Sequence, residues 1–214
     1  MKVNITIPNS LDEITLGQFQ EFSKRSLTLK TDSELNLLIL EVFCGLKLED
    51  TMSIKASDAS AISDIILEML NHKPYKVTSF KMYGEEFAII PDLDEISLGE
   101  YVDLDKYINE YDTMHLAMGV MYRPIAKKLN ELYNLEDYEP LKYDMKNMPM
   151  SAANYALVFF YNLGIDLLKT TNNYSLAEER ALAQKLGLTL NGGGSAQFMH
   201  SLSEILQNLN ISLN

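Results

Sequence analysis

The chain has 214 residues, of which 47% are hydrophobic and 22% charged, as is typical of a globular protein with one large domain or two small ones. Thirty acidic residues outnumber 18 basic ones, so the formal net charge is −12. Nucleic-acid affinity depends largely on Lys and Arg side chains that neutralise phosphates, so we expect no direct DNA or RNA binding. The acidic charge favours contact with a basic protein surface, or it serves only to keep a crowded protein soluble.

The sequence also argues against disulfides and membrane spans. Cys44 is its only cysteine, which excludes an intramolecular disulfide and a cysteine-rich zinc site and suits a reducing compartment. The first residues lack the long apolar stretch of a secretion signal. The most apolar segment, residues 152–168, contains three polar side chains and is shorter than the roughly 20 apolar residues of a membrane helix. We therefore expect no membrane association.

Two stretches resemble each other, because each has a β-prone run, a proline and a capping box. They span residues 7–19 and 90–101. Thr15 with Gln18 forms the first capping box, and Ser97 with Glu100 forms the second, so a helix is predicted to begin at each. A duplicated unit would explain the likeness, and so would independent use of one favourable turn. We favour independent use, because the segments downstream differ.

In the first ninety residues, capping residues and apolar stripes at helical spacing predict three helices. The first spans about 15–25, the second begins at Thr31 and ends at Gly45, and the third follows Ser57. Residues 76–90 predict a hairpin split by Gly84, with residues 3–7 as a third strand.

All later elements are predicted to be helical. They are Ser97–Glu110, Thr113–Tyr133, Ser151–Thr170, Leu176–Leu186 and Ala196–Leu209. Pro124 is expected to kink the second of them. The predicted fold is mainly α with a small antiparallel β-sheet near the N-terminal half (α+β) and a helical, bundle-like body. The predicted regions are 1–90 with helices and the sheet, 91–171 as the helical body, and 172–214 as a C-terminal part.

The C-terminal part has a glycine-rich hinge at residues 191–195, followed by an amphipathic segment. Phe198, Leu202 and Leu206 lie on its apolar stripe. Such a helix on a glycine tether can dock on a partner, or it can fold back on its own body. Both alternatives stay open.

No catalytic pattern is present in the sequence. His72, His115 and His200 are each isolated from any nucleophile pattern, and Cys44 next to Phe43 is expected to be a buried, inert thiol. The glycine run at 192–194 lacks the lysine of a phosphate-binding loop, and the carboxylates after position 92 do not match a calcium loop. We expect no enzymatic activity, no cofactor and no resident metal. The alternative is a metal-dependent enzyme that uses the carboxylates of residues 92–105.

Acidic side chains are concentrated between residues 91 and 112, where eight acids accompany one lysine. The candidates for partner binding in this segment are Asp92, Asp94, Glu95, Asp103 and Asp105. Arg123 and Lys127 lie in the densest basic group and are expected one helical turn apart. The acidic and basic groups can pair inside the fold, or each can meet a partner, which would favour head-to-tail association of copies. Arg123 is also expected to bond carbonyls that Pro124 leaves free.

Four segments in order carry a resemblance to a known family. They are IPDLD at 90–94, SLGEYVDLD at 97–105, MYRPI at 121–125 and VFFYNLG at 158–164. Together they resemble conserved proteins from the structural and assembly gene blocks of tailed bacteriophages, including crAss-like phages of Bacteroidetes. The resemblance covers roughly residues 10–170 and ends near Asn172.

The resemblance implies a tail-assembly chaperone or a virion protein without catalytic residues. Its implied partners are other phage proteins of the tail, portal region or capsid. Its implied location is the virion, or the host cytoplasm during assembly. A cargo protein, packaged in the capsid or tail and ejected with the genome, is the alternative within this class.

Overall fold

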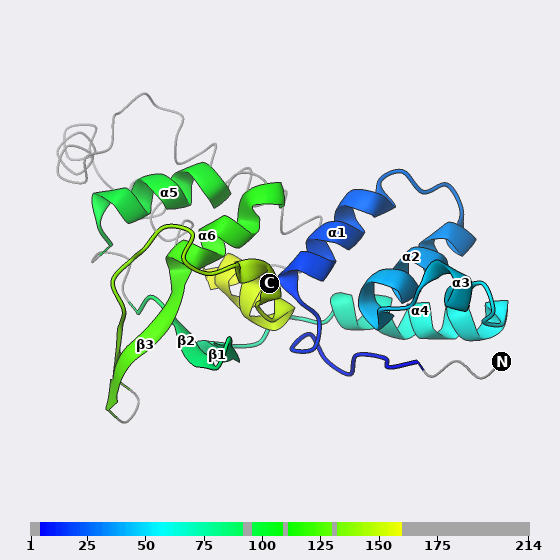
Figure 1. The fold of residues 1–214 in the computed structure, drawn as a ribbon, viewed down its shortest axis with the longest axis horizontal. Helices are drawn as coiled ribbons and strands as arrows, with labels where there is room; N and C mark the ends of the chain where they lie inside the picture. Colours follow the sequence, from blue (N-terminus) through cyan, green and yellow to red (C-terminus); the bar gives the residue numbers. More distant parts are fainter. Residues whose placement is uncertain (1–4, 92–95, 109–110, 130–131, 160–214) are drawn as a thin grey trace, which may run out of the picture.

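The computed structural model describes residues 5–91, 96–108, 111–129 and 132–159, which form a mostly helical fold with one small antiparallel sheet (Figure 1). The predicted mixed α+β class is confirmed. Several predicted features lie outside the described residues. They are the helices at 176–186 and 196–209, the hinge at 191–195, the second half of the helix at 151–170, and the candidates Asp92, Asp94, Glu95, Phe198, Leu202 and Leu206.

Four helices form the N-terminal part. They are α1 (Leu16–Ser26), α2 (Asp32–Cys44), α3 (Leu48–Thr51) and α4 (Ala56–Leu70). The predicted capping boxes at Thr15 and Thr31 are both present and begin α1 and α2. Gly45, with a φ of 66°, ends α2 in the left-handed conformation that glycine adopts without steric cost.

Side-chain contacts join α1 to α2. The rings of Phe22 and Phe43 pack with their centroids 5.1 Å apart. Nε2 of Gln18 donates a hydrogen bond to the carbonyl of Val42 at 2.8 Å, so Gln18 both caps α1 and ties it to α2. The two helices thus form one packed unit.

The sheet has four antiparallel strands in the order β1-β2-β3-β4. Its strands are β1 (Ser79–Met82), β2 (Glu85–Ile89), β3 (Tyr122–Leu129) and β4 (Leu132–Leu135). The predicted hairpin is confirmed, and Tyr83 and Gly84 turn the chain with φ values of 54° and 83°. Both are positive, as in the turns that match strand twist. The predicted third strand at 3–7 is wrong for its described residues 5–7, since β3 pairs with β2 instead.

The predicted helix Thr113–Tyr133 is also wrong, because only its first part is helical. A short 3-10 turn (Tyr111–Thr113) leads into α6 (Met114–Met121), and β3 begins at Tyr122. A residue before proline is pushed towards extended backbone, which favours a strand at Arg123 over a kinked helix. The carbonyl of Pro124 accepts a hydrogen bond from the amide of Glu136, so its missing N–H lies on the β4 side. The pairing of β3 with β4 is irregular just beyond it.

The remaining elements are α5 (Leu98–Ile108), the 3-10 turn η2 (Met145–Asn147) and a helix at 150–159. Of these, η2 and the helix at 150–159 connect the two parts of the molecule. In Figure 1, α1 to α4 lie on one side, the sheet with α5 and α6 lies on the other, and the yellow helix at 150–159 lies between them. Backbone hydrogen bonds join Leu16 to Met148 and Met150 to Ile14.

One buried cluster extends across both parts, from Leu11 to Leu157. Tyr122 is among its largest fully buried side chains, and its hydroxyl donates towards the carbonyls of Val77 and Ala152. Burial raises the pKa of this phenol well above its ordinary value. Within the described ranges, no helix combines the length and apolar character that crossing a membrane requires.

Candidate partner-binding surface

The inner side of α5 holds an ion pair with β3. Ser97 begins the helix through a capping box with Glu100, whose Oε2 accepts from the amide of Ser97 at 2.6 Å. Oε1 of Glu100 lies 2.9 Å from Nη1 of Arg123. The side chains of Glu100 and Arg123 are only 6% and 18% exposed, so the pair is largely buried. Arg123 is therefore used inside the fold.

The sequence left open whether the acidic and basic groups pair inside the fold or each meet a partner, and the ion pair answers this for Arg123. Internal pairing of the acidic and basic groups holds for Arg123, whose partner Glu100 is one of the eight acids of residues 91–112 and also a capping residue. Arg123 and Lys127 do not lie one helical turn apart, because both belong to β3. Pro124 leaves no helical carbonyls free at this place, since a strand replaces the kinked helix.

Two of the partner-binding candidates, Asp103 and Asp105, belong to α5 and lie on different sides of the helix. Oδ2 of Asp103 accepts a hydrogen bond from the hydroxyl of Tyr138 at 2.8 Å, and burial together with this bond raises the pKa of Tyr138. Asp105 follows two residues later and is exposed; residues at this spacing do not face each other on a helix. The two carboxylates therefore do not converge on one ion. Among the described residues, no group of three or more His, Cys, Asp or Glu could hold a metal.

The outer side of α5 is the most apolar exposed helix face near the acidic segment. Leu98, Tyr101 and Val102 are 71%, 41% and 54% exposed, and they share one stripe with Asp105. We call these four residues the α5 outer face. α5 buries Glu100, Leu104 and Ile108 towards the core and leaves this other apolar stripe exposed on its outer side. A contiguous exposed apolar patch is typical of an interaction site.

The two copies of the repeated motif differ in whether their first apolar helix residues are buried. In the first copy, Leu16 and Phe19 are buried in the core. The corresponding Leu98 and Tyr101 of the second copy are exposed. The α5 outer face was not predicted from the sequence, although the likeness of the two copies was visible there. The same local pattern begins both helices, and only the tertiary fold decides which of the two apolar stripes is covered.

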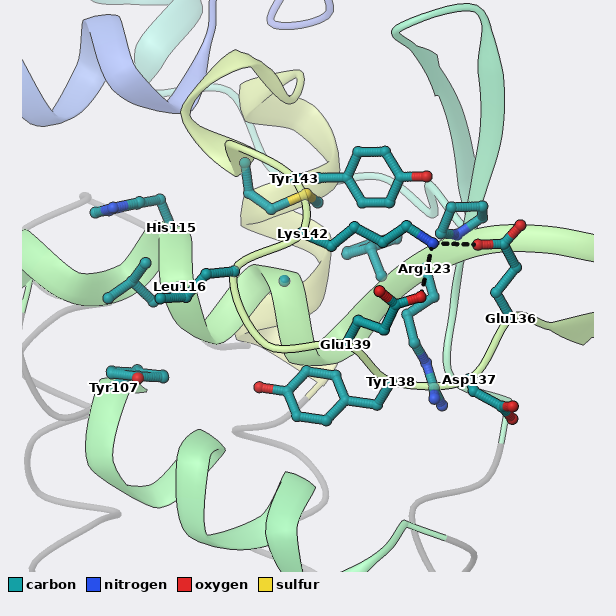
Figure 2. Close-up of a pocket in the computed structure, with 15 residues that line it drawn as sticks. Tyr107, His115, Leu116, Arg123, Glu136, Asp137, Tyr138, Glu139, Lys142 and Tyr143 are labelled. Carbon is teal, nitrogen blue, oxygen red and sulfur yellow. Dashed lines mark hydrogen bonds and ion pairs between the residues drawn. The ribbon is translucent and has the colours of Figure 1, made fainter.

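The segment that follows β4, residues 136–144, passes between α5 and the sheet, and we call it the strap. Figure 2 shows the side chain of Lys142 bonded to both Glu136 and Glu139. Nζ of Lys142 lies 2.9 Å from Glu139 and 3.1 Å from Glu136, and these bonds raise the pKa of Lys142. The hydroxyl of Tyr143 donates to Glu85 on β2 at 2.7 Å. Together with the bond from Tyr138 to α5, these contacts fix the strap between α5 and the sheet.

Beneath the strap lies an open, shallow pocket, with walls from α5, α6, β3 and the strap (Figure 2). His115 lines it, and burial together with Lys146 lowers the pKa of this imidazole despite the opposing effect of Asp144. Its lining residues, all within the described part of the chain, include no Ser, Thr or Cys that could act as a nucleophile. Away from the pocket, Cys44 is half-buried, and burial raises the pKa of its thiol, which lowers its reactivity.

A second exposed apolar site lies at the end of the sheet. β2 pairs with β3 only at residues 87–89 and 122–124, so beyond Pro124 the strand β3 pairs with β4 alone. We call this two-stranded part, residues 125–129 and 132–135, the ribbon. Leu129 and Leu132 face each other across it and are 68% and 77% exposed. Lys127 is exposed on it, and Lys128 pairs with Glu86 at 2.6 Å.

Comparison of the chain with protein-family models, with curated proteins and with solved structures found no match.

Proposed function

We propose that the chain is a non-enzymatic protein of a tailed bacteriophage that acts by binding other phage proteins, either in the virion or during tail assembly. The phage context rests on the four ordered sequence segments between residues 90 and 164. The binding role rests on the α5 outer face, where Leu98, Tyr101 and Val102 are exposed on one stripe. A protein with this surface gains stability by covering it with a partner.

The first experiment tests the α5 outer face as the binding surface. Tagged wild-type chain is used to capture phage proteins from infected cells, beside a Leu98→Ser/Val102→Ser variant. We expect the variant to lose most of the captured phage proteins, because serine removes the exposed apolar area. Leu27→Ser/Leu48→Ser is the matched control, since Leu27 directly after α1 and Leu48 in α3 are 86% and 59% exposed. Equal capture by all three chains would rule out the α5 outer face.

The second experiment distinguishes the roles within a phage. Mass spectrometry of purified particles should find a virion component in a fixed ratio to the other structural proteins, whereas an assembly chaperone should be absent. A cargo protein should be abundant in particles and should leave them with the genome. Absence of the chain from both particles and assembly intermediates would contradict the proposal.

The rival from another class is a metal-dependent enzyme built on the carboxylates of residues 92–105. The separation of Asp103 from Asp105 on α5 speaks against it, as does the use of Asp103 by Tyr138. Titration calorimetry with Mg²⁺, Mn²⁺ and Ca²⁺ is the direct test. Saturable heat at millimolar metal that Asp103→Asn removes would favour the enzyme over the binding role.

A further inference from the structure

We infer that the hydrogen bond between Tyr138 of the strap and Asp103 of α5 sets the orientation in which α5 presents its outer face to a partner. Tyr138 and Asp103 are then positioning residues, which act on binding without touching the partner. The inference rests on the proposed role of the α5 outer face as a binding surface. It gives Asp103, a candidate for partner binding from the sequence, an indirect role in that binding.

Apolar burial fixes the C-terminal half of α5 but not its N-terminal half. The buried side chains of the helix are Glu100, Leu104 and Ile108, so both apolar ones lie in the second half. In the first half a carboxylate takes the buried position, although Leu98 and Val102 are there and stay exposed. The rotation of this half about the helix axis therefore depends on polar contacts, which are directional, whereas apolar contacts are not.

Two polar contacts occupy neighbouring positions on the inner side of this half. Glu100 pairs with Arg123 of β3. Asp103 accepts the hydrogen bond from Tyr138 at 2.8 Å. At about 100° per residue, Glu100 and Asp103 each lie roughly 150° from the middle of the α5 outer face, one on either side. Because the two partners come from different elements and flank the point opposite the outer face, together they resist rotation in both directions.

Tyr138 lies against more of α5 than Asp103. Burial first, and then Asp103, raises the pKa of the Tyr138 phenol, with smaller effects of Tyr107 and Glu100. These three residues of α5 share its inner side. In Figure 2 the hydroxyl end of Tyr138 points towards Tyr107, which lines the same pocket. Tyr138 is therefore the residue through which the strap contacts the helix.

The strap in turn holds Tyr138 in place against the sheet. Nζ of Lys142 bonds Glu136 and Glu139, which flank Tyr138 in the sequence (Figure 2). The hydroxyl of Tyr143 attaches the end of the strap to β2. The bond from Tyr138 therefore ties the N-terminal half of α5 to the sheet, independently of the ion pair with β3.

The test is a double-variant cycle on the capture of phage proteins from infected cells. Tyr138→Phe removes only the hydroxyl, and Asp103→Ala removes the acceptor. Each single variant should weaken capture by roughly three- to tenfold, and the double variant should weaken it no further, because both act through one bond. Tyr75→Phe is the matched control, since the Tyr75 hydroxyl donates to a carboxylate oxygen of Asp12 at 2.9 Å and neither residue belongs to α5 or the strap.

Hydrogen exchange gives a second readout that needs no partner. Relative to the amides of α1 and α2, the amides of α5 should exchange about three- to tenfold faster in Tyr138→Phe, which corresponds to the loss of one hydrogen bond. A role of Tyr138 in overall stability alone would instead speed exchange in all three helices together.

Three results would overturn the positioning role. They are capture that neither single variant weakens, losses that add in the double variant because Asp103 touches the partner itself, and exchange in α5 that Tyr138→Phe leaves unchanged. In each case, loss of capture in the Leu98→Ser/Val102→Ser variant would leave the proposed function standing. Unchanged capture by that variant would instead overturn the α5 outer face as the binding surface, and the positioning role with it.

Discussion

Glu100 and Arg123 join two elements that are far apart in the sequence, because one belongs to α5 and the other to β3. The Glu100 side chain also caps Ser97, so one carboxylate begins its helix and holds it to the sheet. A buried ion pair contributes little net stability over apolar replacements, but removal of one partner leaves an uncompensated buried charge. The pair therefore matters most for keeping α5 in one orientation.

Replacing one partner should cost more than replacing both. Arg123→Met leaves Glu100 buried without its cation, and we expect the free energy of unfolding to fall by about 3 kcal/mol. Glu100→Gln/Arg123→Met removes both charges and should recover a large part of that loss. Urea denaturation of the single and double variants gives the coupling between the two sites. Strictly additive losses would show that the ion pair does not couple α5 to β3.

His115 predicts how stability depends on pH. Burial and Lys146 lower its pKa in the folded chain below the ordinary value of 6.5, against opposing effects of Asp144 and Asp112. The unfolded chain therefore takes up a proton at a higher pH than the folded chain does. The contribution of His115 to stability is complete above that ordinary value and is lost as the pH falls towards the lowered folded pKa.

His115→Gln should flatten this pH dependence, since glutamine does not titrate. Thermal unfolding of the variant and the wild-type chain, followed from above to below the ordinary pKa of 6.5, measures the difference. His72→Gln serves as the control, because His72 is exposed just after α4. If His115→Gln and the wild-type chain lose stability in parallel, the imidazole does not control this transition.

At the scale of single residues, the sequence identified the charged groups but not their contacts. Glu100 was recognisable as a capping residue, since its partner Ser97 lies three positions away. Its ion pair with Arg123 depends on the path of β3, which no local pattern shows. The exposure of Leu98 and Val102 likewise depends on what the rest of the chain covers.

At the scale of elements, the helices that begin with capping boxes were predictable and β3 was not. Caps involve residues three positions apart, so Thr15, Thr31 and Ser97 identify their helix starts locally. The run from Thr113 to Tyr133 has enough apolar residues for a helix, within which Pro124 would be a kink. The restriction that proline places on Arg123 was the signal for extended backbone, and pairing with β2 then stabilises the strand.

The two copies of the repeated motif provide a matched pair of glycine substitutions. A Cβ on Gly17 would lie 3.0 Å from both Cβ and the carbonyl oxygen of Lys146, so Gly17→Ala should lower stability by about 1–3 kcal/mol. A Cβ on Gly99 would meet only Oγ of Ser97, at 3.9 Å. Gly99→Ala should therefore be neutral or stabilise by up to about 1 kcal/mol. Thermal unfolding of both variants tests the close approach of α1 to η2, and equal shifts would contradict it.

At the scale of the whole molecule, the fold class can be predicted from local helix and hairpin patterns in the sequence. The long-range contacts that join the parts of the fold cannot. Mostly helical patterns around one hairpin predict the mixed α+β class. The contacts that close the molecule join Ile14 and Leu16 to Met150 and Met148, more than 130 positions apart. These bonds combine with the buried cluster from Leu11 to Leu157 to make the described parts one packed body.

The packed body predicts the effect of shortening the chain. The described residues already bury a core between Leu11 and Leu157, so deletion of residues 191–214 should leave the unfolding transition nearly unchanged. If Phe198, Leu202 and Leu206 dock on a partner, the same deletion should weaken capture of phage proteins. Thermal unfolding and capture from infected cells measure the two effects, with a chain lacking only residues 210–214 as the control. An insoluble truncated chain would instead show that the C-terminal segment belongs to the core, and its proposed docking on a partner would be wrong.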